Sequence, residues 1–187
     1  MTGPPPCDPD LALIHAISAG DAQALQCLYE RHGAGLLSFL IDRLHDRHCA
    51  EEVLQDVMLA VWKGARAFRG ECKVSTWLLS IARRQATDAY QRHKPPCVAF
   101  NESTAASDAT SVQTLVERNL LYETLADVFH KLPAEQREVV KLVFYHGLTC
   151  AEAARVLEVP VGTVKSRLFH ARQTMRRLFQ TEGITHA

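Results

Sequence analysis

The last long helical pattern in the chain carries side chains that could bind nucleic acid. Residues 160–177 include five Lys or Arg residues and no acidic residue. Short hydroxyl groups and long cations on the first half of a helix fit the base edges of a DNA major groove and the phosphates beside it. We expect such contacts from Thr163, Lys165, Ser166, Arg167, Phe169, His170 and Arg172. Arg167 could contact guanine through two hydrogen bonds, whereas Lys165 could equally bind a phosphate.

Two helices and a tight turn must position this face. Thr149 and Glu152 are three residues apart, as in the capping box that begins a helix, and residues 158–160 form a short predicted turn. An apolar stripe on the following helix would face the core. Its members are Val164, Leu168, Ala171, Met175 and Leu178. A solvated basic face on an ordinary helical hairpin is the alternative, but the agreement of cap, turn and acid-free helix favours a DNA-binding helix-turn-helix.

Charge is segregated along a chain whose net charge is zero and whose pI is about 7.1. Residues 66–92 contain six Lys or Arg residues and two acidic residues, whereas residues 42–58 contain five acidic residues and two Arg. The bulk charge therefore gives no sign of a nucleic-acid partner, but the local distribution does. A neutral protein of this kind can offer different faces to different partners.

Composition predicts an all-α protein. The 187 residues are 47% apolar and only 7% aromatic, which favours helices over sheet. The six cysteines are scattered without a CxxC pair, the first residues lack the pattern of a signal peptide, and no apolar run approaches a membrane span. We therefore expect a cytoplasmic protein with reduced thiols and no direct insertion into a membrane.

Helical periodicity and loop composition predict two small helical domains joined by a flexible linker. The second domain contains the helix-turn-helix, and the linker is rich in Pro and small polar residues. The expected boundaries are a disordered N-terminus at 1–9, a first domain at 10–93, the linker at 94–112 and a second domain at 113–182.

Cap signals and glycines predict where the helices begin and end. Asp21 is a predicted N-cap, and Ser75 and Thr76 are predicted to cap a helix that reaches about residue 93. A separate helix is expected at about residues 35–44. The other expected helices lie at about 49–65, 113–131, 133–145, 149–157 and 161–179.

Two long segments carry further patterns in a fixed order. The first pattern runs through Ala50-Glu51-Glu52, Leu54-Gln55-Asp56-Val57, Trp62, Phe68-Arg69-Gly70, Thr76-Trp77-Leu78 and Ile81-Ala82-Arg83. The second occupies residues 132–139 and 159–168. These segments resemble regions 2 and 4 of the sigma-70 family, in its extracytoplasmic-function branch. The resemblance covers about residues 10–180, and the family also has a linker between its two regions.

The resemblance implies an initiation factor that binds core RNA polymerase, recognises the −35 element with region 4 and melts the −10 element with region 2. The acidic helix predicted at 49–62 matches the family's contact with the clamp helices of the polymerase. The residues implied in that contact are Glu51, Glu52, Leu54, Gln55, Asp56 and Val57. For Leu54 and Val57, packing in the core is an equal alternative.

Residues 66–92 match the family's reader of the −10 element. An opened duplex exposes unstacked bases, which proteins trap with aromatic faces and a basic track. The implied groups are Phe68, Arg69, Lys73, Trp77, Arg83, Arg84 and Arg92. Trp77 could instead lie in the core, and Arg83 and Arg84 could form a solvated face. Residues 70–75 include the family's specificity loop, which varies between members.

Glu158 departs from the family pattern, which commonly has a glycine at this position of the turn. If the position needs a positive φ, the glutamate carries strain of about 1 kcal/mol. The turn could instead be built without left-handed geometry. The resemblance also implies control by an anti-sigma factor, which is often anchored in a membrane.

Other interpretations have less support. His45, His48 and Cys49 could bind a metal, with His45 and Cys49 one helical turn apart. Cys72 or Cys150 could sense redox state, although no resolving partner is visible. We expect no metal or cofactor.

A DNA-binding regulator that does not join polymerase is the main rival to a sigma factor. The segment at 49–92 argues against it, because a conventional regulator would carry a ligand or phosphoacceptor domain there. The sequence also lacks a Gly-rich phosphate loop and a nucleophile motif, so we expect no enzymatic activity.

Overall fold

The computed structural model describes residues 8–92 and 128–181, and every regular element in those ranges is helical. The chain also divides into two compact units. Both observations agree with the predicted all-α fold of two helical domains. The predicted linker at 94–112 and most of the helix expected at 113–131 lie outside the described residues.

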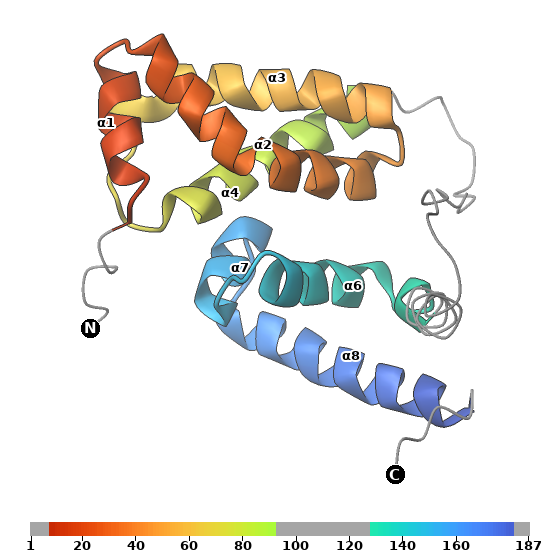
Figure 1. Cartoon of the computed structure of the whole chain (residues 1–187). Coiled ribbons are helices and arrows are strands. Elements are labelled where there is room, and N and C mark those ends of the chain that lie inside the picture. The colour runs from red at the N-terminus through yellow and green to blue at the C-terminus, as the bar shows by residue number, and fades with distance from the viewer. Residues whose placement is uncertain (1–7, 93–127, 182–187) are drawn as a thin grey trace, which may run out of the picture. The chain divides into compact units, whose positions relative to one another are not determined.

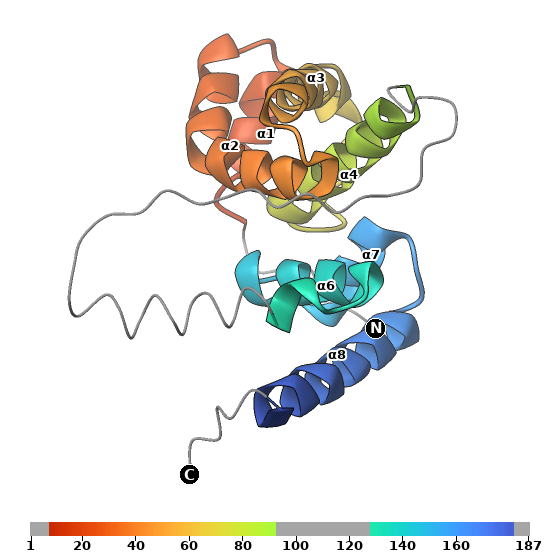
Figure 2. The ribbon, with the colours of Figure 1, turned by 90° about the vertical axis from the view of Figure 1, so that its right-hand side faces the viewer.

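Three long helices and one short helix build the N-terminal unit (Figure 1). They are α1 (Leu11–Ser18), α2 (Ala22–Leu44), α3 (Arg47–Gly64) and α4 (Val74–Arg92), with the 3-10 turn η1 (Ala65–Ala67) after α3. Helices α2, α3 and α4 pack against one another, and α1 packs on α2 and η1. Figure 2 shows α3 between α2 and α4. The largest fully buried side chains of this unit include Ile14, Ile17, Leu28, Leu40, Val57, Val61 and Leu78.

Helix α2 is continuous across Gly33 and Gly35, so the prediction of a separate helix at 35–44 is wrong. Gly33 is buried beside Tyr29, whose ring would lie 3.2 Å from a Cβ atom added at residue 33. The missing side chain therefore allows close packing within one helix instead of ending it. Asp21 is confirmed as the N-cap, because its carboxylate accepts two backbone amide hydrogen bonds, at 2.8 and 3.2 Å.

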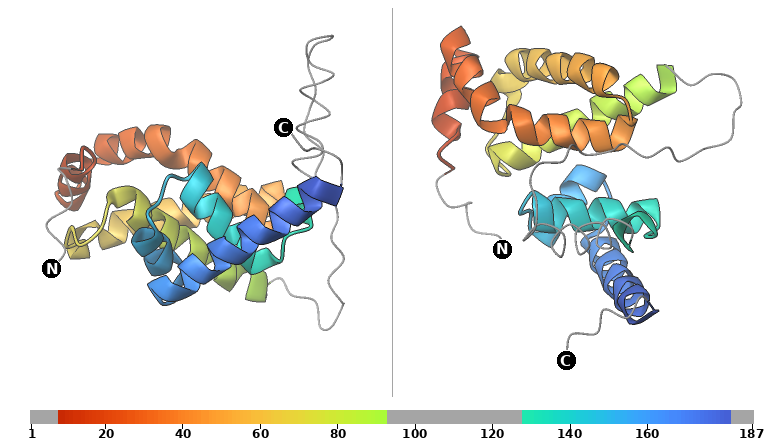
Figure 3. Two further views of the ribbon diagram at one scale, coloured as in Figure 1. Left: turned by 90° about the horizontal axis from the view of Figure 1, so that it is seen from below. Right: turned by 45° about the vertical axis from the view of Figure 1, so that its right-hand side comes forward.

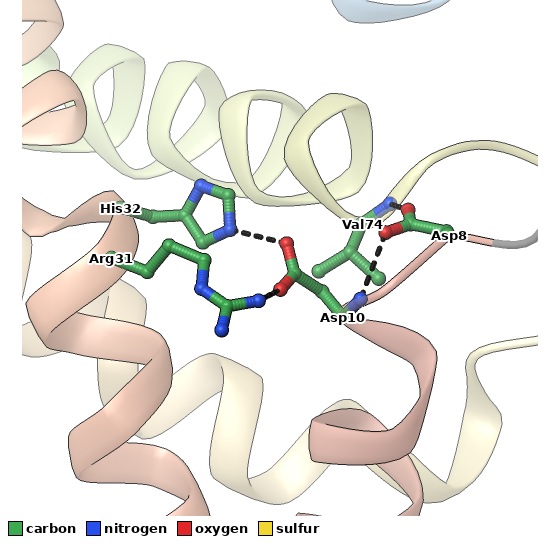
Figure 4. A network of polar contacts seen from close by, with 5 residues as sticks. All are labelled: Asp8, Asp10, Arg31, His32 and Val74. Carbon is green, nitrogen blue, oxygen red and sulfur yellow. Dashed lines mark hydrogen bonds and ion pairs between the residues drawn. The ribbon is translucent and has the colours of Figure 1, made fainter.

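Helix α4 begins at Val74, so the predicted caps Ser75 and Thr76 lie inside its first turn instead. The capping group comes from Asp8, whose carboxylate accepts a hydrogen bond from the Val74 amide at 2.6 Å (Figure 4). Asp8 is therefore part of the folded unit, which corrects the prediction of disorder throughout residues 1–9. A cap supplied from a distant part of the chain has no local sequence pattern, which explains both errors.

The C-terminal unit consists of short helices followed by one long helix (Figure 3). Residues 128–130 are helical, and they are followed by α6 (Ala134–Val140), the π-helical turn η2 (Lys141–Tyr145), α7 (Cys150–Leu157) and α8 (Val161–Thr181). Helix α6 packs against α8, and α7 and α8 form the two helices of the predicted helix-turn-helix.

The predicted capping box is confirmed at the start of α7. The amide and hydroxyl of Thr149 donate to the Glu152 carboxylate at 2.7 and 2.8 Å, and the Glu152 amide donates to the Thr149 hydroxyl at 3.2 Å. The predicted apolar stripe of α8 is buried at Val164, Leu168 and Ala171 and half-buried at Met175 and Leu178. The cap fixes the start of α7, and the buried stripe of α8 leaves the opposite face of α8 in solvent.

The turn between α7 and α8 uses left-handed geometry. Glu158 has a φ of 56°, which decides between the two turn geometries that the sequence leaves open. An L-residue with a Cβ atom pays a steric cost in this region that glycine avoids.

We expect Glu158→Gly to raise the free energy of unfolding of the C-terminal unit by about 0.5–1 kcal/mol, because it removes this cost. Hydrogen exchange of α7 and α8 in increasing urea measures the change within the whole chain. Glu158→Gln is the matched control, since it removes the charge and keeps the Cβ atom. Equal stabilisation by both variants would assign the effect to charge and contradict the strain.

Candidate functional site

The exposed face of α8 carries most of the residues predicted to bind DNA. Lys165, Ser166, Phe169, His170 and Arg172 are exposed, and Thr163 is half-buried. The side chain of Phe169 is a large apolar group that remains 59% exposed. The helix therefore presents cations, a hydroxyl and an aromatic ring on the side away from its buried stripe.

Arg167 is positioned by an ion pair with the preceding helix. Its Nη2 lies 2.7 Å from Oε2 of Glu135 on α6, and its side chain is 22% exposed, whereas that of Glu135 is 70% exposed. Glu135 was not among the predicted site residues, and its spacing from Arg167 gives no local signal. The ion pair therefore fixes the direction of the Arg167 guanidinium. A DNA base would have to compete with the Glu135 carboxylate for this guanidinium or share it.

A second positioning contact joins α8 to η2. The guanidinium carbon of Arg172 lies 5.9 Å from the centre of the Phe144 ring, within the range of a cation–π interaction. Phe144 is 61% exposed. Sequence reasoning did not identify Phe144, because aromatic residues in a helix usually indicate core packing.

An open groove of about 560 Å³ lies between α3 and α4. The α3 wall consists of Asp56, Leu59, Ala60 and Lys63, and the α4 wall of Gln85, Asp88 and Arg92. A carboxylate oxygen of Asp56 lies 4.0 Å from Nη2 of Arg92 across the groove. Its lining thus combines an exposed leucine with charged groups of both signs.

The residues predicted to contact core polymerase divide into two groups. Glu51, Glu52 and Gln55 are exposed and Asp56 is half-buried. Leu54 and Val57 are 4% and 0% exposed. The structure therefore corrects the prediction for Leu54 and Val57, which pack in the core because they lie on the inward-facing stripe of α3.

Leu59 belongs with the exposed group, although it was not predicted. It is 55% exposed and lies one turn after Gln55 and Asp56, so all three share a face of α3. The available signal was that Leu59 is an apolar residue outside the apolar period of its helix. A single exposed leucine does not mark a binding surface by itself, but Leu59 adds apolar area to a face that also carries polar groups.

Phe68 and Trp77 form a close aromatic pair at the start of α4. Their ring centres are 4.7 Å apart and their planes are inclined by 35°. A Cβ atom added at Gly64 would lie 3.6 Å from the Trp77 ring, so α3 also borders the pair. Both rings are half-buried. This placement lies between the two predicted environments of Trp77, the core and an exposed stacking face.

The predicted cations are spread along α4 and the loop before it. Arg69 and Arg84 are exposed, and Lys73 and Arg83 are half-buried. Arg92 lies at the other end of α4, about 22 Å along the helix from Trp77, and faces Asp56. The structure therefore does not bring Arg92 together with the aromatic pair.

The segment considered for metal binding is divided between two helices. His45 is the C-cap of α2 and has a left-handed φ of 55°. Cys49 lies in the first turn of α3, where its amide donates to the N-cap Asp46. His45 and Cys49 therefore do not share a helical face. Within residues 8–92 and 128–181, no group of three or more His, Cys, Asp or Glu side chains is arranged to hold a metal ion.

The Cys49 thiol is in an acidic environment. Partial burial raises its pKa, the carboxylates of Asp46 and Glu52 raise the pKa further, and Arg92 lowers it. A raised pKa leaves less of the reactive thiolate at neutral pH.

We expect iodoacetamide to label Cys49 more slowly than the exposed Cys27 at neutral pH, and the labelling to accelerate as pH rises. Timed labelling followed by peptide mass spectrometry measures both rates. Arg92→Gln should slow the reaction of Cys49 further, because it removes the group that lowers the pKa. Faster labelling of Cys49 than of Cys27 would contradict this description.

Among the described helices, none combines the length and apolar character needed to cross a membrane.

The described residues present three candidate surfaces: the basic face of α8, the aromatic pair at the start of α4 and the mixed face of α3.

Family models match both halves of the chain. Residues 28–95 match the model of Sigma-70 region 2, and residues 122–175 match that of Sigma-70, region 4. The first range contains the α3–α4 groove and the aromatic pair, and the second contains the helix-turn-helix.

Known proteins match nearly the whole chain. It is 36% identical over 175 residues to the ECF RNA polymerase sigma factor SigM of Mycobacterium tuberculosis, covering 90% of this chain and 84% of that protein. It is 30% identical over 188 residues to the ECF RNA polymerase sigma-E factor of Haemophilus influenzae, with coverages of 91% and 95%.

Solved structures share the fold. CnrH, in complex with the cytosolic domain of CnrY, gives a TM-score of 0.66 at 24% identity and covers 93% of this chain and 99% of CnrH. The sigma factor RpoE of Bartonella quintana, in complex with the anti-sigma factor NepR, gives 0.63 at 23% identity, with coverages of 83% and 96%.

Proposed function

Because the chain belongs to the extracytoplasmic-function branch of the sigma-70 family, we propose that it binds core RNA polymerase, directs it to specific promoters and helps to open the −10 element. The observation that carries this proposal is that distinct surfaces occupy the two matched regions: an acidic and apolar face on α3 and an acid-free basic face on α8. A factor that bridges a protein and a promoter needs both surfaces.

The mixed face of α3 is the surface that we assign to core polymerase. Gln55, Asp56 and Leu59 supply a polar group, a charge and an exposed apolar side chain on adjacent turns. Such a combination suits docking against a helical partner, because the leucine provides buried area and the polar groups fix orientation. Glu51 and Glu52 extend the same helix with negative charge.

The start of α4 is the surface that we assign to the −10 element. Phe68 and Trp77 form a half-buried aromatic pair, and Arg69 and Arg84 add positive charge for the phosphate backbone. A base that leaves the duplex gains stacking and hydrogen bonding at such a surface, and this gain offsets the lost pairing. The specificity would come from the loop at residues 70–73.

The exposed face of α8 is the surface that we assign to the −35 element. We assign a base edge to Arg167, in exchange for its ion pair with Glu135, and phosphates to Lys165 and Arg172. The affinity of this unit alone would be modest. Polymerase raises it by holding both units on one promoter, which turns the second contact into an intramolecular event.

We also assign the chain an anti-sigma factor and a cytoplasmic site of action. CnrH was solved in complex with the cytosolic domain of CnrY, and RpoE in complex with the anti-sigma factor NepR. These complexes support a comparable partner for this chain. RNA synthesis itself belongs to the polymerase, so the chain acts as a binding factor and not as an enzyme.

Purification of a tagged chain from its own cells, with crosslinking of bound DNA, tests this function. We expect the core polymerase subunits to co-purify, and the DNA to map upstream of transcription start sites with two conserved elements. Recovery of DNA without polymerase would instead support a conventional DNA-binding regulator. An untagged strain provides the background.

A further inference from the structure

The carboxylate of Asp8 joins the N-terminal segment to the start of α4. One oxygen accepts a hydrogen bond from the Val74 amide at 2.6 Å, and the other accepts one from the Asp10 amide at 3.0 Å (Figure 4). Val74 is the first residue of α4 and follows directly on the loop at residues 68–73. The first amides of a helix have no partner within the helix, so Asp8 satisfies a donor that would otherwise need water.

Asp10 anchors this segment to the bundle. The residue is 5% exposed, and its carboxylate forms an ion pair with Arg31 and lies 2.7 Å from Nε2 of His32 (Figure 4). Both partners are on α2. A buried carboxylate needs such partners to compensate for its lost hydration, and the loss of a partner destabilises the fold. Asp8 is therefore held in place from the side of α2 as well as by its own hydrogen bonds.

The same part of the chain also borders the other end of the loop. Nε of Arg66, in η1, donates to the backbone carbonyl of Ser18 at 3.0 Å, at the end of α1. A Cβ atom added at Gly70 would lie 3.9 Å from the Leu11 side chain, and Gly70 itself has a φ of 67°. The loop between Phe68 and Val74 is therefore attached to the N-terminal segment and α1 on both sides.

We propose that Asp8, held by Asp10, is a positioning residue for reading the −10 element. It fixes the end of the loop relative to the aromatic pair, although it is distant in sequence and need not touch DNA. This inference rests on the proposed function, in which residues 68–77 carry −10 recognition. An ordered loop presents one arrangement of its hydrogen-bonding groups, whereas a released loop can rearrange to accept other bases, so releasing the loop weakens discrimination between bases.

Transcription from a promoter library tests this role. Core polymerase with the full-length chain transcribes templates randomised in the −10 element, and the transcripts are sequenced. We expect Asp8→Ala to reduce enrichment of preferred −10 sequences about fivefold, the factor that corresponds to loss of one cap. Enrichment at a separately randomised −35 element should not change. Hydrogen exchange should show faster exchange of the Val74 amide.

Asp21→Ala is the matched control, because it removes another aspartate cap of the same unit, at the start of α2. It should lower stability similarly and leave the −10 preference unchanged. Asp8→Asn keeps one acceptor oxygen and should give an intermediate loss of −10 preference. This milder variant still tests the inference if Asp8→Ala does not fold. A wild-type preference retained by both Asp8 variants would overturn the inference. Absence of any −10 preference in the wild-type chain would instead overturn the proposed function.

Discussion

Replacement of both Lys165 and Arg167 by alanine is expected to abolish −35-dependent promoter binding while core polymerase binding is unchanged. In the function that we propose, Arg167 contacts a base edge and Lys165 a phosphate, and a good bidentate base contact alone contributes about 1–3 kcal/mol. We expect a combined loss on the order of 100-fold, measured with promoter DNA carrying an intact or scrambled −35 element. The residual affinity of the variant should be equal for the two DNAs.

Glu135→Ala separates the two roles of Arg167. It breaks the 2.7 Å ion pair but keeps the guanidinium. If Arg167 reads DNA, Glu135→Ala should retain −35 binding, because a competing carboxylate has been removed. If Arg167 only braces α8 against α6, Glu135→Ala should lose −35 binding as Arg167→Ala does, and the assignment would be wrong. The stability change of Glu135→Ala should be small, since Glu135 is 70% exposed.

The double variant Asp56→Arg, Leu59→Ala is expected to weaken core polymerase binding on the order of 100-fold. Truncation of an apolar anchor and reversal of a neighbouring charge each cost about 1–3 kcal/mol at a protein interface. Leu59 is 55% exposed, so its truncation should leave the fold intact. Fluorescence anisotropy of labelled chain titrated with core polymerase measures the affinity.

Matched changes on α2 serve as the control for this variant. Glu30→Arg with Tyr29→Ala reverses a charge and truncates a large side chain that is 49% exposed. We expect this control to bind core polymerase as the wild-type chain does. If both double variants bind as tightly as the wild type, the α3 face is not the docking surface. If both lose binding equally, the loss is not specific to α3.

Elements with local signals could be predicted from the sequence. The capping box of Thr149 and Glu152, the N-cap at Asp21 and the buried stripe of α8 each depend on residues within a few positions of one another. Such patterns determine local structure directly. The resemblance to two regions in order then predicted the family, which the matched models and relatives confirm.

Contacts between distant residues could not be predicted in the same way. Asp8 caps α4 from 66 positions away, and Arg167 pairs with Glu135 on another helix. Leu54 and Leu59 are both leucines on α3, yet one is 4% and the other 55% exposed. The helical period places them on different faces of α3, but how far each is buried depends on how α3 packs against its neighbours. The site therefore needed the fold before its exposed residues could be separated from its structural ones.

Promoter-specific transcription by a purified system tests the central claim most directly. Core RNA polymerase is mixed with the full-length chain and a promoter fragment recovered by crosslinking, and the transcripts are mapped. We predict a defined start site downstream of the two elements, dependent on the chain and lost when either element is scrambled. Unchanged transcription by core polymerase, without a new start site and without measurable binding of the chain, would contradict its assignment as a sigma factor.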